Sequence, residues 1–275
     1  MFGSLKRTMR RRLRESVFRK SAVDFVPAFE RYNGWLFGYS LSVSLHEDCQ
    51  TICVSDERDT IFVGRPPRVW LYRKGIEKRL QALARQYFLP DIDTFSGALV
   101  IDVGANVGEL SRYVSDRGAR VISIEPEPLE GRALALNLAG RDSIVINQAL
   151  WSEPATLDFF CKNDSGDSSL IEMANASETR SVQATTLDDV YREYGNDQRV
   201  KLLKLEAEGA EPEILDGARQ MLSHVDYVSA DVGPERGADA QNTFIPVYER
   251  LHAAGFRPIA FGHKRCVTLF KRLDD

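Results

Sequence analysis

The chain has 275 residues, of which 43% are hydrophobic and 28% are charged, and its formal net charge is −4. This length allows one large domain or a domain with an extension, and no apolar run is long enough to predict a membrane span. The four cysteines have no paired metal-site spacing and favour reduced thiols in a cytoplasmic protein.

The first twenty residues hold eight basic side chains and one acidic one, which leaves 28 basic and 39 acidic residues in the remainder. An acidic body of this kind disfavours nucleic-acid binding. Leu5, Met9, Leu13 and Val17 fall four apart and predict one apolar stripe on a basic helix. Such a helix either packs its stripe on the domain or makes peripheral contact with the inner face of an anionic membrane. No apolar segment follows it, so a secretory signal is not indicated.

Residues 25–70 are rich in aromatic and β-branched residues. We expect strands in 35–43 and 51–63, forming a small antiparallel cap. The apolar spacing of 70–88 predicts one helix, which we place over the ligand crevice because it directly precedes the central strand. The expected boundary lies at 98, between an N-terminal extension (1–98) and the main domain (99–275).

From Leu99 onward, apolar runs of strand length alternate with segments of helical spacing, a pattern typical of a parallel sheet. We expect strands at 99–103, 120–126, 144–147, 156–161, 181–184, 200–206, 225–230, 256–261 and 267–270. The helices are expected at 107–114, 129–139, 186–194, 211–222 and 244–254. The last two strands should form an antiparallel pair, and 163–169 should be a loop.

The chain is organised around Leu99–Gly108, a buried strand followed by a glycine turn and a helix. Such a turn presents backbone N–H groups to a ligand. Acidic residues follow the strands of the predicted sheet, namely Asp102, Glu125, Glu206 with Glu208, and Asp231. Helix dipoles could account for any one of them. Glu125, however, lies 21 residues beyond Gly104, at the end of the next strand, where a carboxylate can accept two hydrogen bonds from a ribose.

The turn itself indicates which nucleotide binds. Gly104 and Gly108 give G-x-x-x-G rather than the G-x-G-x-x-G of dinucleotide folds, which disfavours a nicotinamide-dependent oxidoreductase. Asp102 beside the turn would repel a pyrophosphate and suits a cationic ligand with an amino-acid tail. S-adenosylmethionine has such a tail, together with a ribose diol.

Three segments in this order, 102–108, 124–126 and 204–211, resemble the FkbM-type class I S-adenosylmethionine-dependent methyltransferases. The resemblance covers about 99–272 and includes Ser168-Ser169-Leu170 and Thr186–Val190. It implies a Rossmann-like class I methyltransferase fold: a mostly parallel seven-stranded sheet with an antiparallel last strand, here preceded by an N-terminal α+β extension. It also implies methyl transfer to oxygen, commonly on sugars and other hydroxyl-bearing natural products. The family usually has Asp where this chain has Glu206.

The resemblance and the spacing together give candidate roles. Gly104 and Gly108 would let the backbone approach the methionine tail, Asp102 would face the ammonium, and Glu125 would hold the ribose. Gln148 and Ala149 are candidates for the adenine wall. The full predicted set of cofactor-binding residues is Asp102, Gly104, Asn106, Gly108, Glu125, Pro126, Gln148 and Ala149.

Catalysis requires alignment of the acceptor oxygen with the methyl group, and a base or a metal would help a weakly nucleophilic hydroxyl. The candidates are Glu206, Glu208, Asp231 and His263. The alternatives are ligand positioning for Glu206, helix capping for Glu208, and core or loop hydrogen bonding for His263. Three converging carboxylates could also hold a divalent cation of the Mg²⁺ class. Residues 231–237 read as an acceptor-site loop or as a plain turn with a surface Glu–Arg pair.

The sequence therefore favours an S-adenosylmethionine-dependent O-methyltransferase that acts on a carbohydrate, polysaccharide or glycolipid. The alternatives are an O-methyltransferase of a non-sugar natural product and a non-catalytic binding or assembly module. The intact turn and Glu125 argue against the module, which would need neither.

Overall fold

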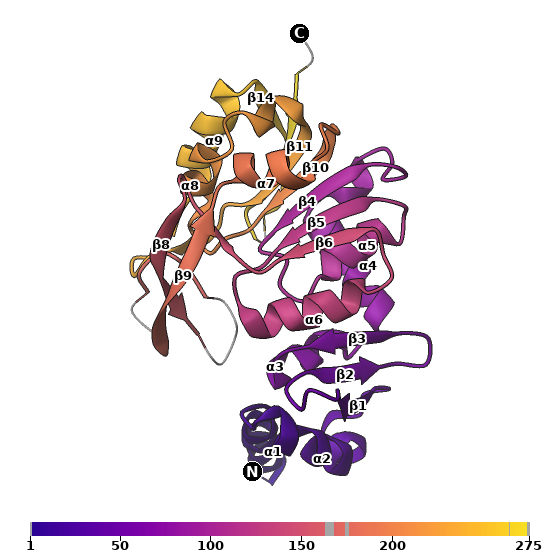
Figure 1. Cartoon of the computed structure of the whole chain (residues 1–275). Helices are drawn as coiled ribbons and strands as arrows, with labels where there is room; N and C mark the ends of the chain where they lie inside the picture. Colours follow the sequence, from indigo (N-terminus) through magenta and orange to yellow (C-terminus); the bar gives the residue numbers. More distant parts are fainter. Residues whose placement is uncertain (1, 163–167, 174–175, 264, 274–275) are drawn as a thin grey trace.

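In the computed structural model, the described residues are 2–162, 168–173, 176–263 and 265–273. A seven-stranded sheet lies at the centre of the molecule (Figure 1). Its strand order is β14 (Phe256–Phe261), β15 (Val267–Arg272), β11 (Val225–Asp231), β10 (Val200–Leu205), β4 (Leu99–Val103), β5 (Arg120–Ile124) and β6 (Ser143–Ile146). Only β15 runs antiparallel to its neighbours, β11 and β14. The predicted class I methyltransferase fold, with its antiparallel last strand, is confirmed.

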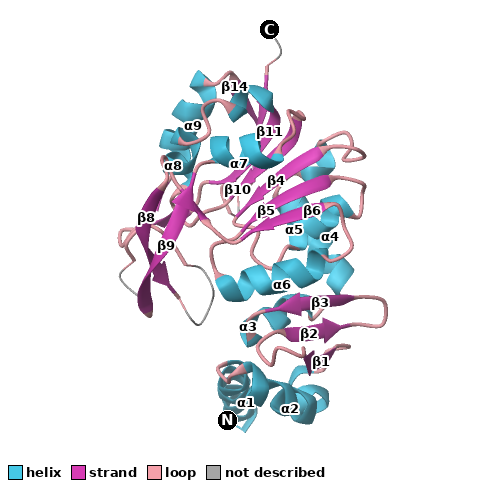
Figure 2. Ribbon diagram, in the orientation of Figure 1, coloured by secondary structure: helices cyan, strands magenta, loops and turns pink. Residues whose placement is uncertain are grey.

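Alternate residues of β4 point to the two faces of the sheet, and both faces are buried. Leu99, Ile101 and Val103 join the core under α7 (Leu187–Tyr194), α8 (Glu211–Asp216) and α9 (Phe244–Ala253). On the other face, Val100 packs with residues of α4 (Ile76–Gln86) and α5 (Glu109–Ser115). Helix α6 (Pro128–Leu138) covers the glycine turn, because Leu134 and Leu138 contact Ala105. The layers are visible in Figure 2.

The N-terminal region contains more helix than the sequence suggested. Helix α1 (Phe2–Phe18) is followed by α2 (Ala22–Tyr32), one wide helical turn at Asn33–Phe37, and an antiparallel sheet of β1 (Ser42–Leu45), β2 (Ile52–Ser55) and β3 (Thr60–Val63). The predicted strand at 35–43 is therefore wrong over most of its length. Ser21 caps α2 by accepting the backbone N–H of Asp24, and buried Phe25 and Phe29 lie one turn apart on its inner face.

The N-terminal stripe packs on the protein at its carboxyl end. Val17 is 1% exposed in a core with Phe25 and Phe29, and the Arg14 guanidinium lies 5.1 Å from the centre of the Trp70 ring. Met9, two steps earlier in the stripe, is 65% exposed. Among the described helices, none combines the length and apolarity needed to cross a bilayer.

The single helix predicted at 70–88 is two shorter segments, Trp70–Tyr72 and α4, which follow α3 (Pro66–Val69). Gly75 separates them with φ of 101°, a conformation that favours glycine. Asp56 from the β2–β3 turn then accepts the backbone N–H of Ile76 and so fixes the start of α4.

Beyond β6, the segment β7 (Ala149–Leu150), β8 (Ala155–Cys161) and β9 (Glu178–Thr185) forms a separate three-stranded sheet beside the cavity. The predicted loop 163–169 falls largely outside the described residues. The helix predicted at 211–222 stops at Asp216. Gly217 follows as its C-cap, at a position where a side chain would overlap the backbone oxygen of Trp151. Arg236 in the 231–237 loop pairs with Glu213 of α8, and β12 (Pro234–Arg236) pairs with β13 (Gln241–Asn242).

Candidate active site

A cavity of about 450 Å³ opens at the carboxyl ends of β4, β5 and β10. Residues of α3 and α4 line one side of it, which confirms the predicted position of the lead-in helix over the crevice. Seven of the eight predicted cofactor residues line it: Asp102, Gly104, Asn106, Glu125, Pro126, Gln148 and Ala149. Gly108 does not.

The glycine turn is shaped by close backbone packing. Gly104 (φ 66°), Asn106 (φ 53°) and Gly108 (φ 81°) all have left-handed conformations. A Cβ at Gly104 would overlap the backbone oxygen of Glu206, and one at Gly108 would lie 2.5 Å from Leu134 of α6. Gly108 is not among the residues that line the cavity, and its predicted role in letting the backbone approach the methionine tail stays a prediction. This glycine allows α5 to pack against α6.

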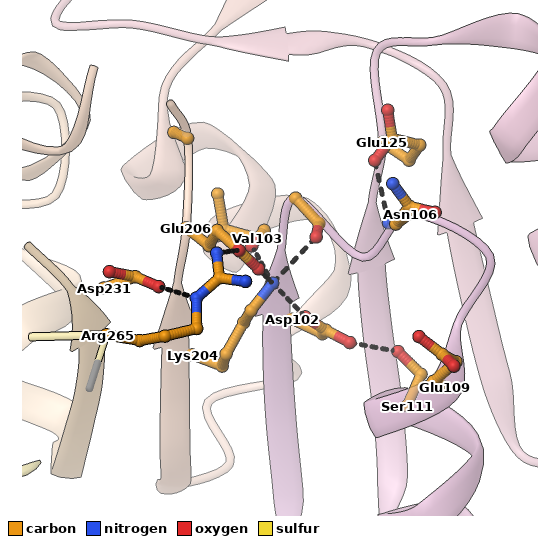
Figure 3. Close-up of polar contacts among 12 residues, drawn as sticks. Asp102, Val103, Asn106, Glu109, Ser111, Glu125, Lys204, Glu206, Asp231 and Arg265 are labelled. Carbon is orange, nitrogen blue, oxygen red and sulfur yellow. Dashed lines mark hydrogen bonds and ion pairs between the residues drawn. The ribbon is translucent and has the colours of Figure 1, made fainter. Parts of the chain in front are cut away.

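Glu125 is arranged to accept further hydrogen bonds. One carboxylate oxygen accepts the backbone N–H of Asn106 at 2.8 Å (Figure 3). The other accepts the backbone N–H of Glu127 at 2.9 Å, and the residue is 7% exposed on the cavity wall. Each oxygen keeps a lone pair for another donor. Burial raises the pKa of Glu125 to about 7. A ribose diol would supply two such donors, so this residue fits S-adenosylmethionine.

A buried lysine lies beneath the glycine turn. Lys204 Nζ donates to the backbone oxygens of Val103 (2.9 Å) and Gly104 (2.7 Å), and lies 3.2 Å from both Asp102 Oδ1 and Glu206 Oε2 (Figure 3). Burial opposes its charge, but the two carboxylates raise the pKa of Lys204. Charged lysine therefore links the ends of β4 and β10.

Lys204 changes what can be expected of Asp102. The carboxylate of Asp102 is fully buried, accepts a hydrogen bond from Ser111 Oγ (2.6 Å) and already has Lys204 as a cationic partner. Its predicted role in facing the ammonium of the cofactor stays a prediction.

The acidic edge beyond β10 and β11 is held around Arg265. The guanidinium lies 3.5 Å from Asp231, 3.8 Å from Glu206 and 3.4 Å from Glu235. Burial and neighbouring Glu206 raise the pKa of Asp231 to about 6, and burial with Asp231 raises the pKa of Glu235 to about 7. Burial acts in the same direction on Glu206, but Lys204 outweighs it and lowers the pKa of this group.

The four predicted catalytic residues are not all brought together. Glu206 and Glu208 line the cavity. Asp231 is 1% exposed behind them and reaches the edge through Arg265. His263 is exposed, with its ring 5.7 Å from that of Phe261, and is not among the residues that line the cavity.

The suggested Mg²⁺ site finds no support in the side-chain arrangement. Within the described ranges, no three His, Cys, Asp or Glu side chains are grouped so that they could hold a metal ion. The positive charge among Glu206, Asp231 and Glu235 comes from Arg265 instead.

Sequence reasoning missed Lys204, Arg79, Glu235 and Arg265 as site residues. Lys204 carried a usable signal, since a charged residue inside the apolar run 200–205 needs buried partners. Arg79 donates to both carboxylate oxygens of Glu109 (2.7 and 2.8 Å) and lines the cavity from α4, but its sequence context is that of a surface helix.

The Methyltransferase FkbM domain matches residues 102–258, more than half of the chain. The chain belongs to the FkbM methyltransferase family. S-adenosylmethionine is accordingly its cofactor, and the geometry at Glu125 fits that ligand.

The FkbM chain is also similar to individual proteins. It is 29% identical over 157 residues to "Methyltransferase sdnD" of Sordaria araneosa, a match that covers 44% of this chain and spans 61% of the length of that relative. Among solved structures, magnesium protoporphyrin IX methyltransferase from Synechocystis with bound SAM is 15% identical, with a TM-score of 0.42 and coverage of 74% of this chain and 83% of that one. A SAM-dependent methyltransferase from Aquifex aeolicus is 14% identical, with a TM-score of 0.42 and coverage of 70% and 96%.

Proposed function

We propose that this FkbM-family protein transfers the methyl group of S-adenosylmethionine to a hydroxyl of a carbohydrate, polysaccharide or glycolipid. The observation that carries the proposal is the carboxylate of Glu235. It lines the cavity and has Arg265 Nη2 3.4 Å away, and burial together with Asp231 raises its pKa to about 7. A base with a pKa near the working pH is suited to accept a proton from a hydroxyl as the oxygen attacks.

The other residues of this edge support the same chemistry. S-adenosylmethionine supplies a methyl group that a nucleophilic oxygen can take by in-line displacement. Glu206 and Glu208 line the cavity beside Glu235 and offer acceptors to a bound hydroxyl, while Gln86 offers an amide group. Asp231 keeps Arg265 in position rather than meeting the acceptor itself.

A sugar acceptor is supported by the family resemblance and by these polar groups, because hydroxyl-rich ligands need several donors and acceptors. Peripheral contact with a membrane that carries a glycolipid acceptor is a second part of the proposal. The exposed side chains of Met9, Arg11 and Arg12 on α1 support it.

Incubation with methyl-labelled S-adenosylmethionine and a panel of glycans, glycolipids and simple alcohols tests the proposal. We expect label in a glycan as an ether, seen as a mass gain of one methyl group. Glu235→Gln should lower this transfer at least about tenfold while S-adenosylhomocysteine affinity stays unchanged. Label found only on nitrogen, or full transfer by E235Q, would contradict the proposal.

A further inference from the structure

Most of the charged residues that line the cavity form ion pairs with one another. The acidic residues are Asp102, Glu109, Glu125, Glu206, Glu208 and Glu235, and the cationic ones are Arg68, Arg79, Lys204 and Arg265. Arg79 is held by Glu109, Lys204 by Asp102 and Glu206, and Arg265 by the acidic edge.

Arg68 differs from the other three cations. It lies on α3, is partly buried, and lines the cavity. Its Nε is buried without a hydrogen bond, and within the described part of the chain its guanidinium forms no ion pair. Its neighbours Arg65 and Arg79 both have carboxylate partners, Glu130 and Glu109. Arg68 is close enough to act on the carboxyl groups of Glu109 and Glu130. Burial raises the pKa of Glu130, and Arg68 works against that rise. Burial also opposes the charge of Glu109, but Arg79 and, to a smaller extent, Arg68 outweigh it and lower the pKa of Glu109.

A partly buried cation without a partner is costly, and a ligand carboxylate would compensate it. S-adenosylmethionine carries one carboxylate, which would meet six acidic side chains in this cavity. Glu109 is the first residue of α5, directly after the glycine turn, and Arg68 acts on it electrostatically. The cation is therefore on the side of the cavity where the turn receives the methionine portion.

We infer that Arg68 binds the carboxylate of the methionine portion of S-adenosylmethionine, with Arg79 and its partner Glu109 as the neighbouring support. The N-terminal segment 66–88 then completes the cofactor site, which the glycine turn alone leaves without a cation for that group. The assignment adds a carboxylate subsite to the diol site at Glu125.

The test compares two ligands that differ only in the carboxylate: S-adenosylmethionine and decarboxylated S-adenosylmethionine. Calorimetry on the full chain should show that Arg68→Gln weakens S-adenosylmethionine binding roughly 10- to 100-fold, the range for a charge-assisted hydrogen bond. Its affinity for the decarboxylated ligand should change less than about twofold.

Arg73→Gln is the matched control, because Arg73 lies five residues away, stacks on Trp70 4.3 Å from the ring centre, and does not line the cavity. It should leave both affinities unchanged. Arg68→Lys keeps the positive charge and should recover part of the preference for S-adenosylmethionine over the decarboxylated ligand. This recovery would show that the loss in R68Q comes from the missing charge and not from a folding defect.

Equal weakening for both ligands, or no weakening for either, would overturn the inference. This failure is distinct from a failure of the cofactor assignment, which would appear as no binding of S-adenosylmethionine to the wild-type protein.

Discussion

Replacement of Glu125 by Ala gives the sharpest test of how the cofactor is held. The carboxylate offers one free lone pair on each oxygen, because each oxygen already accepts one backbone N–H. Two ribose hydroxyls donating to an ionised carboxylate contribute about 1.5–3 kcal/mol each. Even at the lower limit, the loss is about 3 kcal/mol, or roughly 100-fold in the dissociation constant.

Calorimetric titration with S-adenosylhomocysteine measures this loss. An analogue that lacks both ribose hydroxyls should bind wild-type and E125A proteins with equal affinity, which separates the diol contacts from any change in the Asn106 and Glu127 backbone. Glu153→Gln, at an exposed position outside the cavity, controls for the change in net charge. If E125A binds S-adenosylhomocysteine within threefold of wild type, Glu125 does not hold the ribose.

Four further outcomes are expected. Burial raises the pKa of Glu125 to about 7, so above pH 4.5 the folded state binds more protons than the unfolded state. The free energy of unfolding, measured in urea, should therefore fall between about pH 5 and pH 8, and the E125Q variant should show a smaller fall over the same range. Lys204→Met leaves Asp102 and Glu206 without their buried cation and should lower the free energy of unfolding by about 3–5 kcal/mol; a loss below 1 kcal/mol would argue against this network. Gly104→Ala should cost about 2 kcal/mol or more and impair S-adenosylhomocysteine binding, whereas Gly34→Ala, with open space around it, should cost little in the same assays. Arg11→Glu combined with Arg12→Glu should reduce cosedimentation with phosphatidylserine vesicles, and equal cosedimentation would exclude α1 as the contact.

The central sheet was predictable because its strands are short apolar runs that alternate with amphipathic helices. β4, β5, β10 and β11 all lie within a residue or two of the expected positions. The ends of these strands carry the acidic residues, so the position of Glu125 beside the glycine turn also followed from order along the chain.

The N-terminal region was harder to predict because several of its aromatic residues lie in helices. Phe25 and Phe29 suit a strand by composition, and only the Ser21 cap and their spacing identify a helix. The break at Gly75 depends on Asp56, twenty residues earlier, and no local pattern contains that contact.

The site charges could be predicted only in part. The positions of side chains at strand ends follow from the topology of the sheet. Arg68, Arg79 and Arg265, in contrast, lie in separate segments, and the packing between those segments determines which partners they have. The same limitation explains Asp231, whose strand-end position was clear but whose carboxylate is turned toward Arg265.

Lys204 has a consequence for the energetics of ligand binding. Its ammonium is fixed by two backbone oxygens and two carboxylates before any ligand arrives, and it is only 3% exposed. The dipoles and charges at the ends of β4 and β10 are thus oriented during folding. A cofactor entering the cavity meets an electric field already in place, and the reorganisation that water would need is avoided.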